Sequence, residues 1–197
     1  MIIGTVWNPQ GPASDPGSGV PAAALALSAD VSADSVVTEL AVTGGPGRDS
    51  LDVEVDYSGV AAQQGRVLVD ADVGEGDNHV GKYIVTGVTH TRVQASVLAG
   101  DGANVIDLDT ELGGDGDAAY SVDLGDGDNA GRVSFGDGVR GARPEAGERT
   151  VTGSYRTGGG SNTLELASRA VEPLVSDFAL DFGTGSGAVL ARYGVMD

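Results

Sequence analysis

The sequence predicts a mainly β protein, either an antiparallel β-sandwich or two small β domains with a protruding hairpin. Glycine supplies 33 of the 197 residues without a collagen-like period, well above the usual share of roughly 7%. Between the glycines, short Val-rich segments alternate apolar and polar residues, which is typical of half-buried strands. Aromatic residues make up 5% of the chain. We therefore expect a light core of β-branched and small side chains.

Residues 1–21 are expected to form an arm or linker without regular structure. The segment NPQGPASDPGSGVP (8–21) is rich in Pro and Gly, which disfavour regular elements. Trp7, near the start of this arm, is a candidate anchor on a neighbouring subunit. The alternative is a loose terminus, which is common in proteins.

From residue 22 onward the sequence predicts close to a dozen short strands. In 50–60, Leu51, Val53 and Val55 alternate with acidic residues, which predicts a strand with an acidic outer face. Gly-Asp and Gly-Gly pairs between the segments supply the positive φ of tight turns. Residues 30–40 and 164–175 carry weak signals for a helical turn. The remaining predicted strands lie in 65–73, 81–100, 104–112, 119–127, 131–138, 149–159 and 161–175.

A Gly/Asp-rich stretch places a domain boundary near residue 112, giving β domains over 22–112 and 113–197. The tripeptide Gly-Asp-Gly recurs at 100, 114, 125 and 136. Its spacing is uneven and its flanking residues differ. We interpret it as recurring turn chemistry rather than as the repeat of a solenoid.

The composition is strongly acidic, with a formal net charge of −18 and Lys82 as the single lysine. Such a chain repels nucleic acid and anionic lipid, so neither is an expected partner. At ~1 M salt, repulsion between charges is screened beyond about 3 Å. Under these conditions an acidic surface keeps a protein hydrated and dispersed without destabilising its fold. This favours a halophilic source. The sequence shows no signal peptide and no membrane-spanning run, and the absence of Cys excludes disulfides and thiolate catalysis.

A cation is the one ligand for which the sequence offers candidate residues. Asp126, Asp128 and Asp137 occupy positions 1, 3 and 12 of an EF-type loop. Ala130 at position 5 and an Asp in place of the terminal Glu depart from that pattern. A looser Ca²⁺ or other cation site that also uses Asp115 or Asp117 remains open. The alternative is that Asp and Gly fill the exposed turns of an acidic protein.

No motif predicts catalysis or nucleotide binding, so we expect a protein that is not an enzyme. The Gly-rich segments 158–161 and 183–187 lack the Lys-Ser/Thr of a phosphate-binding loop. His79 and His90 are the two histidines, and no Gly-x-Ser-x-Gly elbow accompanies them. A hydrolase would lose activity when either histidine is replaced.

Residues 133–160 predict a two-stranded hairpin with an arginine-lined loop. A strand through Phe135 enters a Gly-Asp-Gly turn, and a return strand carries Tyr155 and Arg156. The loop arginines suit the acidic edges of an adjacent copy, or else they balance local acids. We accordingly select as candidate interface residues Trp7, Phe135, Arg140, Arg143, Arg149, Tyr155 and Arg156.

The same stretch resembles a segment of baseplate J-like proteins and of related tail-fibre or tail-tip proteins of tailed viruses. The resemblance rests on a Tyr-x-Val strand at Tyr120, the Phe-Gly-Asp-Gly corner from Phe135, the Pro144 loop and a Tyr-Arg-x-Gly-Gly-Gly exit from Tyr155. It covers about forty residues, roughly one fifth of the chain.

This resemblance implies a virion structural protein of the tail tip or baseplate, without cofactor or reaction. Its partners would be copies of itself in a symmetric oligomer and other virion proteins. The acidic composition would place the virus on a halophilic host. The alternatives are a capsid decoration or turret protein and, from another class, a calcium-dependent carbohydrate-binding module that uses the Asp-rich loops.

Overall fold

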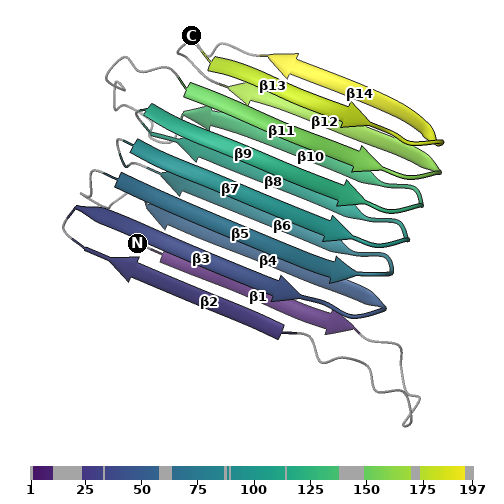
Figure 1. Ribbon diagram of the computed structural model, residues 1–197, viewed down its shortest axis with the longest axis horizontal. Coiled ribbons are helices and arrows are strands. Elements are labelled where there is room, and N and C mark those ends of the chain that lie inside the picture. Colours follow the sequence, from purple (N-terminus) through teal and green to yellow (C-terminus); the bar gives the residue numbers. More distant parts are fainter. Residues whose placement is uncertain are drawn as a thin grey trace.

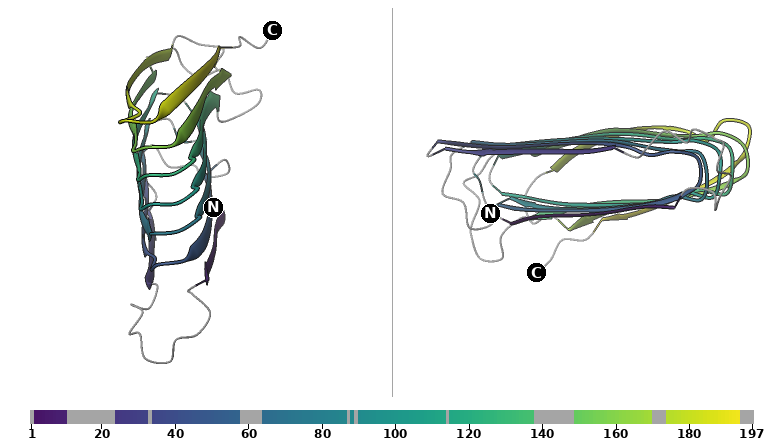
Figure 2. Two further views of the ribbon diagram at one scale, coloured as in Figure 1. Left: turned by 90° about the vertical axis from the view of Figure 1, so that its right-hand side faces the viewer. Right: turned by 90° about the horizontal axis from the view of Figure 1, so that it is seen from below.

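A computed structural model shows a β-solenoid, in which the chain winds back and forth between two facing sheets (Figures 1 and 2). The structure describes residues 2–10, 24–32, 34–57, 64–86, 88, 90–113, 115–137, 149–169 and 174–193. These residues form fourteen strands and no helix. The expectation of an antiparallel sandwich is therefore wrong, because the strands of both sheets pair mostly in parallel.

Each sheet contains seven strands. The first has the order β1 (Ile2–Gln10), β4 (Arg48–Tyr57), β6 (His79–Thr86), β8 (Val105–Leu112), β10 (Ala130–Asp137), β12 (Ser161–Arg169) and β14 (Ser186–Tyr193). The second has the order β13 (Leu174–Asp181), β11 (Arg149–Thr157), β9 (Asp115–Leu124), β7 (His90–Ala99), β5 (Gln64–Gly74), β3 (Ser35–Thr43) and β2 (Ala24–Val31). We call them the even sheet and the odd sheet.

From β3 to β12 every strand pairs in parallel with the strand two places later in the chain. Parallel neighbours need a crossover connection. Here the crossover is the strand of the opposite sheet, so two strands make one coil of the solenoid. At the N-terminal end β1 pairs antiparallel with β4, and β2 pairs antiparallel with β3.

Alternation of side chains places one face of each sheet in the core. In β5 and β7 every second residue is buried, as the period of two demands. Stacked coils bring these residues into columns, such as Leu40, Val69, Ala95 and Tyr120 of the odd sheet. Gly153 continues that column, and Phe178 follows it. Glycine leaves room between the rings of Tyr120 and Phe178, because a Cβ at Gly153 would lie 2.5 Å from the Phe178 ring.

The solenoid also corrects how the sequence was divided. The sheets run without interruption across residue 112, since β7 pairs with β9 on the far side of that boundary. Ile2–Gln10, expected to be part of an irregular arm, forms β1. The weak helical signals fall in the strands β2, β3, β12 and β13.

The protruding hairpin of 133–160 is not formed. β10 belongs to the even sheet and β11 to the odd sheet, so the two strands are not paired with each other. β10 pairs with β8 and β12, whereas β11 pairs with β9 and β13. A strand–turn–strand sequence is compatible with both a hairpin and a coil, because local turn chemistry does not fix which neighbour a strand chooses.

The C-terminal end of the solenoid is open. β13 and β14 are the last strands of their sheets, and among the described residues no strand pairs with their outer edges. The exposed fractions of Leu180 and Val189 are 37% and 45%. Both lie in register with buried residues of the preceding coil, Tyr155 and Leu164. The inner face of the last coil is thus partly uncovered.

Candidate functional site

The most regular feature of the surface is a row of tight turns along one edge of the solenoid, which connects the odd strands to the even strands (Figure 1). A glycine with positive φ stands at the same place in successive turns: Gly47, Gly76, Gly102, Gly127 and Gly160. A Cβ on Gly127 would overlap the carbonyl oxygen of Gly102 in the coil before it. Close stacking of backbone on backbone therefore requires glycine here.

Two residues after these glycines, a column of buried asparagines ties the coils together. It consists of Asn78, Asn104, Asn129 and Asn162. Each of the first three donates Nδ2–H to the Oδ1 of the next, at 3.1, 3.0 and 3.0 Å. The backbone amide of Asn104 donates to the same Oδ1 of Asn129, at 3.1 Å. We call this column the asparagine ladder.

The ladder is almost fully satisfied from within the chain. The side-chain amide of Asn104 also donates, through Nδ2, to the carbonyl oxygens of Gly100 and Gly102, at 3.0 and 3.3 Å. At the N-terminal end Asp49 takes the corresponding position, and its backbone amide donates to Asn78 Oδ1 at 2.9 Å. Buried amides that find all these partners support a single register between coils.

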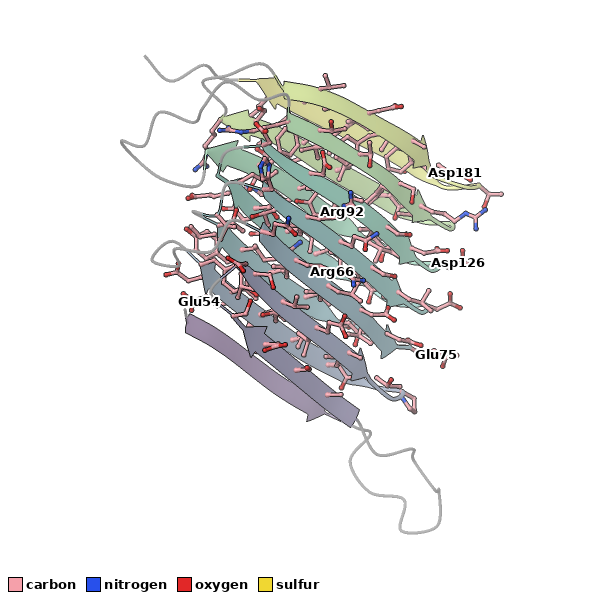
Figure 3. The ribbon with its side chains drawn as sticks, turned by 60° about the vertical axis from the view of Figure 1, so that its left-hand side comes forward. Glu54, Arg66, Glu75, Arg92, Asp126 and Asp181 are labelled. Carbon is pink, nitrogen blue, oxygen red and sulfur yellow. The ribbon has the colours of Figure 1, made fainter. Side chains whose placement is uncertain are left out.

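Exposed carboxylates beside the ladder make a second set of ties. Asp126 Oδ1 accepts the backbone amide of Gly159 at 2.6 Å, and Asp128 Oδ1 accepts that of Ser161 at 2.8 Å. Asp101 Oδ1 accepts the amide of Asp126 in the same way, at 2.9 Å. Figure 3 shows Glu75, Asp126 and Asp181 along this edge. The carboxylates of Asp101, Asp126 and Asp128 thus each bind the backbone of the next coil.

The structure brings two of the three predicted metal ligands together. Asp126 and Asp128 share one turn, whereas Asp137 ends β10. At ~3.3 Å per residue, that end lies about 25 Å from the turn. In the described part of the chain no three His, Asp or Glu residues form a group that could hold a metal ion.

The residues selected as an interface lie in different environments. Phe135, Arg149 and Tyr155 are buried, with 3%, 2% and 2% of their surface exposed. Arg156 is exposed and lies 3.7 Å from both Asp123 and Asp181 of neighbouring coils. Trp7 belongs to β1. Arg140 and Arg143 lie outside the described residues.

The outer face of the even sheet carries a shallow groove of about 580 Å³, which we call the acidic groove. The residues that line it include Asp52, Glu54, His79, Gly81, Tyr83, Asp107 and Asp109. Burial, followed by the nearby carboxylates of Glu111, Asp109 and Asp56, raises the pKa of Tyr83. His79 lies 3.9 Å from Asp52. The groove is therefore a region of negative potential without an assembled nucleophile and base.

Lys82 points the other way, into the core, and is 3% exposed. It stands in register between Val53 and Leu108, where the column is otherwise apolar. Its Nζ has no hydrogen-bond partner among the described residues and lies 4.7 Å from the centre of the Tyr120 ring. Desolvation lowers the pKa of Lys82 to about 7, and the carboxylate of Asp109 partly opposes that shift.

The sequence contained signals for both the ladder and Lys82. The informative repeat is Gly-x-Asn, with Gly at 76, 102, 127 and 160. The Gly-Asp-Gly tripeptide obscured this repeat, since Gly136 and Asp137 of one copy belong to the strand β10 and not to a turn. Lys82 falls between Val80 and Ile84 in a period-two pattern, which places its side chain on the buried face.

Comparisons with protein-family models, with curated proteins and with solved structures found no match to this chain. Over the described residues there is no helix of the length and apolarity needed to cross a membrane.

Proposed function

We propose that the protein is a structural subunit of a virion, in the tail tip or baseplate of a tailed virus with a halophilic host. The observation that carries the structural role is the continuous asparagine ladder, which locks successive coils in one register. A solenoid of this kind is a quasi-one-dimensional scaffold whose coils contact their neighbours. It suits a part that must hold a shape.

The use of the polar groups supports this role. The Asn and Asp side chains of the turns accept and donate within the chain, as Asn104 and Asp126 do. The two histidines lie on exposed strand ends, beside Asp52 and Asp115. None of these contacts forms a nucleophile–base pair of the kind that acyl or phosphoryl transfer needs.

The acidic surface supports the halophilic setting. Exposed arginines lie beside an acid of the adjacent coil, with Arg132 3.6 Å from Asp107 and Arg192 3.4 Å from Glu165. Exposed pairs of this type contribute little each, about 0–1 kcal/mol. The excess of acids over bases remains unpaired overall, so the fold needs salt to screen it.

The tail position rests on the sequence resemblance of 120–160 to baseplate J-like and tail-tip proteins. In the solenoid, these residues extend from β9 to the turn before β12, and Gly160 takes the ladder-turn position. The last glycine of the Gly-Gly-Gly exit is required by the coil, because Gly160 has a positive φ and stacks closely on Gly127. The resemblance thus supports a virion role by the order of its residues, without the hairpin it implied.

Labelling of intact virus particles from the source with gold-conjugated antibody against this chain tests the proposal. We expect gold at the tail tip. Gold over the head would make the protein a capsid decoration or turret protein and would contradict the tail position. Particles without gold, in a preparation where the same antibody detects the chain by blotting of infected cells, would contradict the virion role.

A further inference from the structure

We propose that the open C-terminal coil binds a second copy of itself, end to end, to form a closed dimer. In this dimer β13 of one copy pairs with β14 of the other. The inference does not depend on the virion role.

The first reason is the uncovered edge. The outer edges of β13 and β14 have no strand partner among the described residues. An open strand edge presents unpaired N–H and C=O groups and is a template for a further strand. At the other end of the solenoid, the antiparallel strands β1 and β2 follow the parallel stack, so the two ends differ.

The second reason is the apolar surface at this end. Leu180 and Val189 face inward but are 37% and 45% exposed, and Leu190 on the outer face is 48% exposed. Phe178 is partly buried, and its ring stacks on that of Phe135, on the earlier strand β10, with 6.3 Å between the ring centres. A further coil would cover these exposed side chains, as each coil covers the one before it.

The third reason is charge, which selects a second copy and its orientation. β13 carries Asp177 and Asp181, whereas the one charged residue of β14 is Arg192. A two-fold axis parallel to the strands lays β13 on β14 of the other copy, twice. An axis perpendicular to the sheets would instead lay β13 on β13 and repel. β13 and β14 run in opposite directions (Figure 1), so the favoured pairing is antiparallel.

The area is sufficient. Each strand has eight residues, or ~26 Å at ~3.3 Å per residue, and two sheets packed ~10 Å apart span about 20 Å with their side chains. The end face thus covers roughly 500 Å², and a dimer buries about 1,000 Å², the lower limit for a specific interface. Continuation of both sheets across the interface adds backbone hydrogen bonds to this area.

The register brings complementary side chains together. With β13 and β14 at the same level of the coil, Phe178 lies opposite Val189 of the second copy. Asp177 then lies diagonal to Arg192 of that copy, a distance that long side chains span. The same contacts occur twice, as an isologous interface requires.

The experiment measures the mass of the full chain by light scattering and sedimentation, in the lowest salt that keeps it folded. We expect a dimer for the natural chain and a monomer for Val189→Lys, because an inward-facing Lys blocks edge pairing. Leu98→Lys is the matched control: Leu98 is 47% exposed on the mid-solenoid odd strand β7, and this variant should stay dimeric. Circular dichroism confirms that each variant is folded.

A charge exchange tests the pairing itself. Arg192→Asp should weaken the dimer about tenfold, and Asp177→Arg combined with Arg192→Asp should restore it. A monomeric natural chain, a dimeric Val189→Lys variant, or assemblies that grow beyond two copies would overturn the proposal. A double variant no tighter than Arg192→Asp alone would overturn the pairing of β13 with β14.

Discussion

Asn104 and Asn129 lie 25 residues apart in the chain and meet in the core, where Asn104 Nδ2 donates to Asn129 Oδ1 at 3.0 Å. Both side chains are buried, with 0% and 1% exposed. The contact recurs in successive coils from Asn78 to Asn162, so one side-chain type fixes the spacing of these coils. It also means that a polar side chain, rather than an apolar one, specifies which strands become neighbours.

Replacement of Asn104 by Ala should lower the free energy of unfolding by about 2–4 kcal/mol, since it orphans buried donors and acceptors on both adjacent coils. Chemical denaturation followed by circular dichroism measures this. Gln94→Ala removes an exposed amide from β7 and should change stability by less than about 0.5 kcal/mol. Equal effects of the two variants would show that the ladder does not stabilise the fold.

A methyl group added to the glycine row should be far more damaging than one added elsewhere. Gly127 has φ 136°, and its Cβ would overlap the Gly102 carbonyl oxygen. Gly127→Ala should therefore cost at least about 2 kcal/mol. At Gly136 the nearest atom to an added Cβ is 3.6 Å away, so Gly136→Ala is the matched control and should be tolerated. Thermal unfolding of both variants decides the matter, and a tolerated Gly127→Ala would contradict the close stacking.

Lys82 should make stability depend on pH. Its pKa is about 7 in the folded chain, against 10.5 for an ordinary lysine. Between these values the unfolded chain binds the additional proton, so the free energy of unfolding rises with pH, by up to about 1.4 kcal/mol per unit. Below pH 7 the full penalty is present. Denaturation at pH 7, 8 and 9 measures the slope.

Lys82→Met should raise stability at pH 7 by about 1–4 kcal/mol and flatten that slope, because an apolar side chain then fills the column. The loss of the contact with Tyr120 works against this gain. Arg66→Met removes a cation that is half exposed and should leave the slope unchanged. A Lys82→Met variant with the slope of the natural chain would assign the pH dependence to other groups.

Salt should stabilise the fold. With a net charge of −18, self-repulsion falls as the Debye length shrinks from about 10 Å at 0.1 M to about 3 Å at 1 M salt. The free energy of unfolding should increase by at least about 1 kcal/mol across that range. Glu54→Gln with Asp70→Asn removes two exposed acids, one from each sheet, and should reduce the salt dependence. A free energy of unfolding that is the same at both salt concentrations would count against the halophilic setting.

The sequence predicted the strands well and their neighbours poorly. The alternation of Leu51, Val53 and Val55 identified β4 and its buried face, because side-chain period is a local property. Whether β4 pairs with β6 in parallel or forms a hairpin depends on contacts across a whole coil. The Gly-x-Asn spacing held that information, but its intervals of 26, 25 and 33 residues between Asn78 and Asn162 concealed it.

For the candidate sites, the sequence identified the acidic residues of the turns but not the role that they have in the structure. Asp126 and Asp128 suggested a cation, and the structure shows that each accepts a backbone amide of the next coil. The same residue type at the same spacing serves either role, and only the position of the following coil distinguishes them.

The two edges of the solenoid differ in how freely the chain can change length. On the ladder edge, the connection from Leu124 to Ala130 must place Asn129 and Gly127 against their equivalents. On the opposite edge, β8 and β9 are joined by residues 113–114, whereas β10 and β11 are joined by residues 138–148, and the strands keep their register across both. Foreign peptides, such as an epitope or a purification tag, should thus be accommodated at 138–148 but not at Gly127.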